Sequence, residues 1–313
     1  MNEQTLIEKL AGGCANAVPE RADIIALQQL SLDELRGRGQ RFLTMIEQQD
    51  ECSHDRADWT THDDHTMVNL AQGARVVVYH ASGALQYVSG MAPLENLFAR
   101  VEEREPLIRQ VEAAAKRLNV AAWAGDRSEL VFERLWQNKA QGADRNDRRS
   151  EVVLARVVGA YRQRIGGIPV LGAASVAVKL AGDGRLDGLS IQMRQATGET
   201  IDTAPIVAPE LGARAIVQQL LALLGRSSKP LPGDVVESAL LYFGYLDLGK
   251  RKTQRVLAPA YVAQVVLRHE MERQAYMLAV PATERPYLQL PLYGVESVVT
   301  RSRVGQHCED VIR

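Results

Sequence analysis

The stretch Tyr161–Gly172, with the sequence YRQRIGGIPVLG, decides the fold of this chain. It continues a β-branched run that begins at Val152, and its Gly-Gly pair predicts a turn because glycine adopts positive φ angles without a steric penalty. Two further strand-like runs follow at 176–180 and 186–194. They flank Ala181–Gly184, whose Asp-Gly pair is a strong hairpin signal. This region therefore predicts a set of antiparallel strands.

Four polar side chains of this stretch divide between the two faces of the predicted strand. Tyr161 and Gln163 fall on one face, and Arg162 and Arg164 fall on the other. We expect polar strand residues of this kind to face water. The alternative is that Tyr161 and Gln163 contact a ligand, which makes them candidate binding residues.

Helix and strand signals alternate on both sides of this stretch. Ser31 and Glu34 form a capping-box sequence before an apolar stripe and predict the start of a helix. The other expected elements are strands at 67–70, 75–80, 85–89, 130–136, 235–246, 255–268 and 274–280, and helices at 94–101, 107–118 and 210–224. Residues 1–30 carry no strong period. This order predicts an α+β fold with antiparallel sheets packed on helices.

Four regions follow from these elements. They are an N-terminal helical segment and loop at 1–60, a β-hairpin and helix unit at 61–140, an α+β unit at 150–285 and a C-terminal tail at 286–313. The polar, charged segment 141–150 is the predicted linker between the two central units.

The α+β unit at 150–285 resembles the propeptide domains of secreted metalloproteases. The residues that carry the resemblance are Tyr-Arg-Gln at 161–163, Gly-Ile-Pro-Val at 167–170, Gly172 and the Asp-Gly hairpin at 183–184, which match the fungalysin/thermolysin propeptide (FTP) module. The helix at 210–224 and the strands at 235–280 are similar to the PepSY module that follows it in those propeptides. The resemblance implies tandem cystatin-like units, with antiparallel curled sheets packed on helices.

In that family the modules inhibit the attached protease and act as its chaperone. We expect no protease domain here, and Met1–Leu10 lacks the apolar stretch of a secretory leader. The sequence therefore predicts a non-catalytic interaction protein, such as an inhibitor, chaperone or accessory factor.

Composition excludes several other classes of function. Net charge is −1, so a nucleic-acid partner is not expected. No apolar run reaches 18 residues, which argues against a membrane span. Three widely spaced cysteines fit a reducing compartment, and we expect a cytoplasmic protein. No glycine-rich nucleotide motif is present, so we expect no cofactor.

Motifs for metal chemistry are incomplete. The segment from His269 to Arg273 begins like the His-Glu-x-x-His motif of metalloproteases, but a cation stands where the second zinc ligand belongs. A second cluster contains Cys52, His54, His62 and His65. These residue types bind zinc, but they lack the regular spacing of a structural site, and a solvated loop is the preferred interpretation.

An enzyme remains the alternative function. Strand residues Tyr242, Tyr245, Tyr261 and Tyr276, with His269, are candidate lining residues of an apolar pocket between a curled sheet and its helix. Such a pocket would bind a small apolar molecule and could support a cyclase or an isomerase. The competing interpretation is that these tyrosines fill the core, since aromatic residues favour strands. The oligomeric state is left open.

Overall fold

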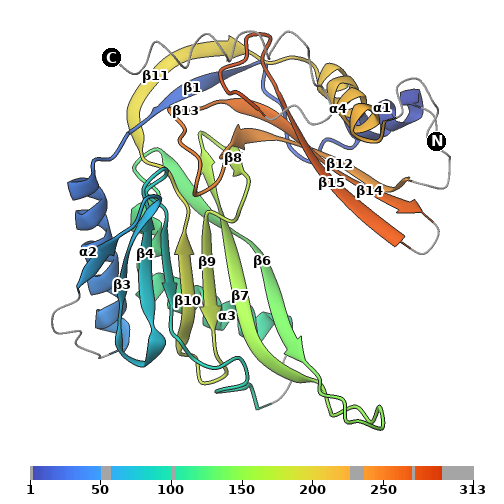
Figure 1. The fold of residues 1–313 in the computed structure, drawn as a ribbon. Helices are drawn as coiled ribbons and strands as arrows, with labels where there is room; N and C mark the ends of the chain where they lie inside the picture. Colours follow the sequence, from blue (N-terminus) through green and yellow to red (C-terminus); the bar gives the residue numbers. More distant parts are fainter. Residues whose placement is uncertain (1–2, 51–57, 100–102, 226–235, 270–271, 291–313) are drawn as a thin grey trace. The chain divides into compact units, whose positions relative to one another are not determined.

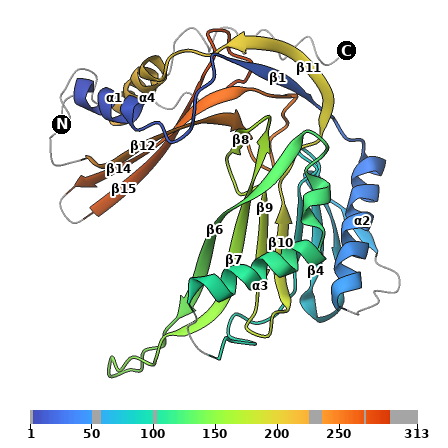
Figure 2. The same ribbon diagram turned by 180° about the vertical axis from the view of Figure 1, so that it is seen from behind.

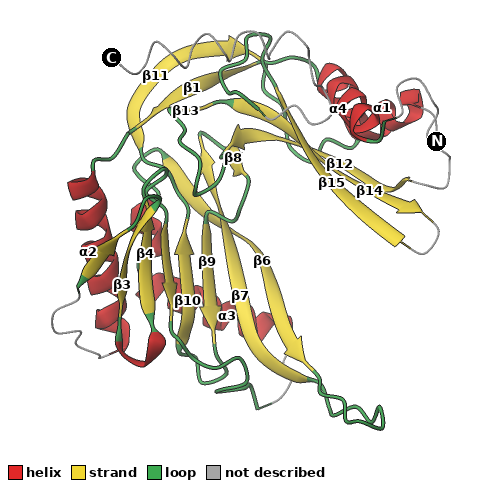
Figure 3. Cartoon of the chain, in the orientation of Figure 1, coloured by secondary structure: helices red, strands yellow, loops and turns green. Residues whose placement is uncertain are grey.

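The computed structural model describes residues 3–50, 58–99, 103–225, 236–269 and 272–290. These residues divide into two compact units. Unit 1 comprises Met1–Ile24, Asp202–Gly244 and Ala258–Arg313, and unit 2 comprises Ile25–Ile201 and Tyr245–Leu257. The protein is a mixed α+β structure in which antiparallel strands predominate, as predicted (Figure 3).

Unit 2 contains two successive blocks, each with one helix followed by four strands of one sheet. In the first, helix α2 (Leu32–Asp50) precedes β2 (Trp59–Thr61), β3 (His65–Asn69), β4 (Arg75–Tyr79) and β5 (Leu85–Val88). In the second, α3 (Arg104–Arg117) precedes β6 (Ser128–Ala140), β7 (Val153–Ile165), β9 (Val176–Leu180) and β10 (Leu186–Ile191), with the short β8 (Ile168–Leu171) after β7. The last strands of the two blocks pair with each other, with Leu189 opposite Tyr87. The sheet order is therefore β6-β7-β9-β10-β5-β4-β3-β2, antiparallel throughout.

Helices α2 and α3 cover the same face of this sheet (Figure 2). Phe42 of α2 lies in the core, where its ring meets the ring of Trp123 edge-on at 6.0 Å. Helix α3 approaches β7 closely at Gly159, where an added Cβ would lie only 2.1 Å from a methyl group of Val111. Glycine is therefore required at this point by the contact between helix and strand.

A buried ion pair fixes the loop that precedes α3. Arg156 donates from Nε to a carboxylate oxygen of Asp187 at 2.8 Å, and the Lys179 ammonium lies 2.7 Å from the same oxygen. Arg156 also donates to the carbonyl oxygens of Ala92 and Glu95 at 2.9 and 2.8 Å. One buried guanidinium therefore connects the sheet to a loop about 60 residues away in sequence.

The capping box at the start of α2 is confirmed. The Glu34 amide donates to Ser31 Oγ at 3.3 Å, and the Glu34 carboxylate accepts hydrogen bonds from the Ser31 amide at 2.7 Å and hydroxyl at 2.8 Å. These bonds lower the pKa of Glu34, chiefly through the Ser31 amide.

Replacing Ser31 with alanine should lower the free energy of unfolding by about 1 kcal/mol, because the first turn of α2 loses its side-chain acceptor. Urea denaturation followed by tryptophan fluorescence measures this, since the chain's tryptophans, Trp59, Trp123 and Trp136, all belong to unit 2. Ser31→Asp keeps an acceptor at the N-cap and should restore most of the loss. Equal stability of wild type and Ser31→Ala would contradict the role of the cap.

Unit 1 consists of two helices on a small antiparallel sheet. Helices α1 (Glu3–Gly12) and α4 (Pro209–Leu223) lie side by side over β12 (Val236–Leu246), β14 (Pro259–His269) and β15 (Glu272–Pro281) (Figures 1 and 2). At Gly212 of α4 an added Cβ would lie 2.4 Å from the ring of Tyr261, so the helix packs directly on the sheet at this point.

The chain passes between the units four times, at 24–25, 201–202, 244–245 and 257–258. The first three of these passages lie inside strands, namely β1 (Arg21–Leu27), β11 (Ala196–Pro205) and β12. Strand β1 stands between β11 and the two-residue β13 (Val256–Leu257) in a small sheet.

Several expectations from the sequence need correction. Residues 1–30, which show no strong period in the sequence, contain helix α1 and strand β1. Strand β11 was not expected from the sequence either. The helix expected at 94–101 is absent from its described part, 94–99, which forms turns whose backbone groups bind tertiary partners such as Arg156. The expected linker 141–150 is instead the loop between the antiparallel partners β6 and β7, and it lies inside unit 2. The expected tail 286–313 is described only as far as residue 290.

Among the described residues, no helix is long and apolar enough to cross a membrane.

Candidate functional site

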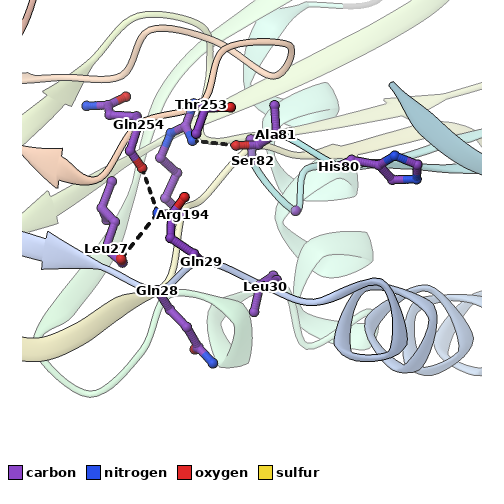
Figure 4. Close-up of a pocket in the computed structure, with 11 residues that line it drawn as sticks. Leu27, Gln28, Gln29, Leu30, His80, Ala81, Ser82, Arg194, Thr253 and Gln254 are labelled. Atoms are coloured by element: carbon purple, nitrogen blue, oxygen red, sulfur yellow. Dashed lines mark hydrogen bonds between the residues drawn. The ribbon is translucent and has the colours of Figure 1, made fainter. Parts of the chain in front are cut away.

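A cavity of about 190 Å³ lies in unit 2, next to the turn that joins β4 to β5 (Figure 4). Its walls come from the segment after β1, from that turn, from the end of the β10 segment and from the residues before β13. The lining residues are Leu27, Gln28, Gln29, Leu30, His80, Ala81, Ser82, Gly83, Arg194, Thr253 and Gln254. Polar side chains therefore predominate in this cavity.

Arg194 forms one wall of the cavity and is almost fully buried, with 4% of its side chain exposed. Its Nε donates to Asp247 Oδ1 at 3.0 Å, and its two Nη atoms donate to the carbonyl oxygens of Ala81, Gly249 and Lys252 at 3.1, 2.9 and 2.7 Å. These bonds use four of the five N–H groups of a guanidinium. Arg194 therefore joins the 80–83 turn to the 247–252 loop, and little of its donor capacity is left for a ligand.

The polar side chains beside Arg194 are also engaged with the backbone. The Gln254 side chain donates to two carbonyl oxygens at 2.7 and 2.8 Å and accepts from a backbone amide at 3.0 Å. Ser82 Oγ donates to the Lys250 carbonyl at 2.8 Å, and Gln29 Nε2 donates to the Gln254 carbonyl at 3.0 Å. These contacts hold the walls of the cavity in place.

A second buried guanidinium lies behind the turn. Arg38 of α2 is 2% exposed and donates to the carbonyl oxygens of Gly83 and Met193 at 2.8 and 3.3 Å, with its guanidinium 5.0 Å from the ring centroid of Trp123. Burial, with a smaller contribution from Arg41, lowers its pKa to about 10. In the part of the chain that the structure describes, no carboxylate forms an ion pair with Arg38. The electrostatic environment behind the turn therefore disfavours a cationic ligand.

The chemical capacity of this cavity is limited. Its volume is below the range of about 300–1,000 Å³ that is typical of small-molecule sites. His80, the imidazole in its lining, has one nitrogen 2.8 Å from Thr66 Oγ1 and the other 3.2 Å from the Asp63 carbonyl. The cavity suits a few water molecules or a small ion, and its lining offers no activated nucleophile.

Tyr161 and Gln163 are buried on the side of β7 that faces α3, so the expectation that they face water is wrong. The Tyr161 ring packs edge-on against Phe132 with centroids 5.5 Å apart, and burial, with a smaller contribution from Glu112, raises the pKa of its hydroxyl to about 12. Gln163 Nε2 donates to the Ala124 carbonyl at 3.2 Å and to Ser128 Oγ at 3.0 Å. Both side chains pack inside unit 2.

The tyrosines of the last block do not share one cavity. Tyr261 is buried under α4 and donates to the Val207 carbonyl at 2.7 Å, and burial, followed by Cys14 and Glu210, raises its pKa. Tyr245 lies in a separate core cluster of unit 2. Tyr242 neighbours the buried Phe243 in β12 and so lies on the other face of that strand. The Tyr276 hydroxyl donates to Gln274 Oε1 at 2.7 Å, and His269 is the last residue of β14, opposite Glu272.

The histidine-rich segment is described only in part. Cys52 and His54 lie outside the described residues. His62 and His65 stack with ring centroids 4.6 Å apart, and His65 Nδ1 lies 2.6 Å from Asp64. Within the described ranges, no three His, Cys, Asp or Glu side chains are grouped so that they could hold a metal ion.

The free edge of the unit 1 sheet is a second candidate site. Strand β15 pairs with β14 in unbroken register from Ala260 opposite Pro281 to His269 opposite Glu272, and it has no other strand neighbour among the described residues. Residues 274–281, QAYMLAVP, carry no charge, and Met277 is 60% exposed. The charged residues of β15, Glu272 and Arg273, lie at its first two positions, and the rest of this edge lacks the charges and bulges that usually protect a sheet from pairing with another chain.

Strand β6, at the border of the unit 2 sheet, differs from β15 in the regularity of its register and in its charge. Its register with β7 shifts between Phe132 and Arg134 and again between Asn138 and Lys139. Glu129, Glu133, Arg134 and Lys139 are distributed along it. Bulges and charges of this kind discourage strand addition, so β15 is the better candidate.

No protein-family model matches the sequence, and a search of curated protein sequences finds no significant match.

Reasoning from the sequence missed the two buried arginines beside the 80–83 turn, Arg38 and Arg194. Arg38 follows Leu35 by three residues and precedes Phe42 by four, so it occupies the apolar stripe of the predicted helix, and that position was an available signal. Arg194 ends a predicted strand, and no local pattern distinguishes it from a solvated residue.

Proposed function

We propose that this chain is a non-catalytic interaction protein, acting as an inhibitor, chaperone or accessory factor, and built from propeptide-like modules of cystatin-like fold. The recurring arrangement supports this, since α2, α3 and α4 are each followed by antiparallel strands of the sheet that they cover. The three widely spaced cysteines support a cytoplasmic location, and the net charge of −1 argues against a nucleic-acid partner.

The observation that carries the proposal is the free edge of β15. A strand edge presents a row of backbone N–H and C=O groups that bind an extended polypeptide, while pockets for alternate side chains give specificity. Strand β15 is suited to binding by strand addition for three reasons. It pairs with β14 in regular register over ten residues, its residues 274–281 carry no charge, and Met277 is exposed. We propose that the protein binds an extended segment of another polypeptide along β15.

The alternative, a small-molecule cyclase or isomerase, has less support. It requires a roomy apolar pocket with converging polar groups, whereas the cavity in unit 2 is small and polar. Tyr245 and Tyr261 lie in different core regions, whereas Tyr242 and Tyr276 are only partly buried. Helix α4 packs directly on its sheet at Gly212.

Selection of displayed random peptides against the folded protein tests the proposal. Wild type should enrich extended sequences with alternating apolar residues, and Met277→Lys should weaken their binding at least about tenfold, because a charge in the middle of an edge strand discourages pairing with an added strand and removes an apolar cross-strand contact. Fluorescence anisotropy with a labelled selected peptide measures the dissociation constant.

Leu211→Lys is the matched control, since it introduces the same charge at a residue of α4 that is 57% exposed. It should bind the peptide as wild type does. Peptides that bind Met277→Lys and wild type equally would exclude β15 as the binding edge.

A further inference from the structure

The five central residues of strand β15, 275–279, have a nearly palindromic side-chain pattern. Around Met277, alanine occurs two residues away on each side, at Ala275 and Ala279, and a large apolar residue occurs one residue away on each side, at Tyr276 and Leu278. When two identical strands pair antiparallel about a twofold axis, residues at equal distances from the axis face each other, so this pattern brings alanine opposite alanine and a large apolar residue opposite a large apolar residue.

We propose that the partner strand which fits β15 is the β15 of a second copy of this chain, paired antiparallel about a twofold axis through Met277. The inference rests on the proposed function, because it names the occupant of the same edge. In this register Met277 lies opposite the partner's Met277, Tyr276 lies opposite the partner's Leu278, and Ala275 lies opposite the partner's Ala279.

This register keeps the two faces of the sheet separate. Tyr276 and Leu278 are on the face that packs on α4, where Leu278 is buried, while Ala275, Met277 and Ala279 are on the other face. Tyr276 lies opposite the partner's Leu278, and Ala275 lies opposite the partner's Ala279. Both members of each pair therefore belong to the same face of the sheet. The helices of both copies then cover the same side of a continuous sheet, whereas a shift by one residue would place them on opposite sides.

Charge favours the same register. The charged residues of β15, Glu272 and Arg273, lie at one end of the strand, so in this pairing Arg273 faces the partner's Pro281 and no like charges meet. A shift of the axis to Ala275 would place Glu272 opposite the buried Leu278. A shift to Ala279 would place Tyr276 opposite the partner's Ala282 and would leave only residues 277–281 of β15 within the pair.

Cysteine cross-linking tests the register directly. Met277→Cys should give a disulfide-linked dimer under mild oxidation, because a residue on the twofold axis meets its own copy. Ala275→Cys is the matched control on the same face. Its copy would lie four residues along the strand, about 13 Å away, beyond the reach of a disulfide. The double variant Ala275→Cys/Ala279→Cys should cross-link again.

The linked peptide is identified by mass spectrometry, which separates these products from those of the native cysteines. Analytical ultracentrifugation of the full chain provides the second measurement. Wild type and Leu211→Lys should sediment as dimers, and Met277→Lys as a monomer with unchanged far-ultraviolet circular dichroism.

The outcomes separate this inference from the proposed function. A wild-type monomer at high micromolar concentration overturns the dimer, and the proposed function stands if that monomer binds selected peptides along β15. A dimer that survives Met277→Lys, or one that cross-links through Ala275→Cys but not through Met277→Cys, also overturns the inference. A wild-type dimer that the selected peptides dissociate, together with a disulfide-linked Met277→Cys dimer, supports both.

Discussion

Replacing Arg194 with methionine should lower the free energy of unfolding of unit 2 by about 3–5 kcal/mol, because removing one partner of a buried ion pair leaves the other charge uncompensated. Asp247 would lose its guanidinium partner, and three carbonyl oxygens of the cavity wall would lose their donor. Arg194→Lys retains the charge but lacks the forked geometry that reaches all four acceptors, so it should recover only part of the loss.

Urea denaturation followed by tryptophan fluorescence measures the Arg194 effect. Arg251→Met is the matched control, since Arg251 belongs to the same loop but is largely exposed, and its ion pair with Asp64 should contribute at most about 1 kcal/mol. Hydrogen exchange of the 247–254 amides should quicken in Arg194→Met. If the two methionine variants are equally stable, Arg194 does not hold the loop.

Replacing Asp187 with asparagine should destabilise unit 2 by about 3 kcal/mol, because the buried Arg156 guanidinium loses its counter-ion while its carbonyl acceptors remain. The effect should depend on pH. Burial alone would raise the pKa of Asp187, but hydrogen bonds from Lys179, Ser89 and Arg156 outweigh it, and the pKa is lowered.

The direction of the pH dependence follows from that shift. A carboxyl whose folded pKa lies below its unfolded value stabilises the protein above the unfolded pKa, and this stabilisation is lost as pH falls through the folded pKa. The stability difference between wild type and Asp187→Asn should therefore be full at pH 7 and shrink in acid. Asp183→Asn, at an exposed hairpin with a local ion pair, should change stability by less than about 1 kcal/mol. A pH-independent difference would exclude the ionised Asp187 as the cause.

Features with a local cause were predictable from the sequence. The capping box at Ser31, the glycine turn at 166–167 and the Asp-Gly hairpin at 183–184 each depend on a few neighbouring residues, and the structure confirms all three. The coarse class, α+β with antiparallel sheets, followed from the order of such signals.

Features that depend on distant partners were not predictable. Arg194 meets Asp247 and Ala81, which are 53 and 113 residues away, so no window of sequence indicates the cavity wall. Residues 94–99 have a helical apolar pattern but form no helix. Arg156, about 60 residues later in the chain, donates hydrogen bonds to the carbonyl oxygens of Glu95 and of the nearby Ala92. The sequence predicts a strand at 274–280, which corresponds to β15. Its position at the border of the sheet, however, depends on the pairing of β14 with β12.

The four passages of the chain between the units have a consequence for biosynthesis. On the ribosome, α1 emerges about 200 residues before α4, against which it packs, so unit 1 cannot complete its fold until α4 and the strands up to Pro281 have been made. Both helix-and-strand blocks of unit 2 are complete by Ile201, but Arg194 leaves the exit tunnel well before Asp247. For that interval the nascent chain holds a guanidinium without its carboxylate, and the cavity wall can form only after the loop that carries Asp247 has emerged.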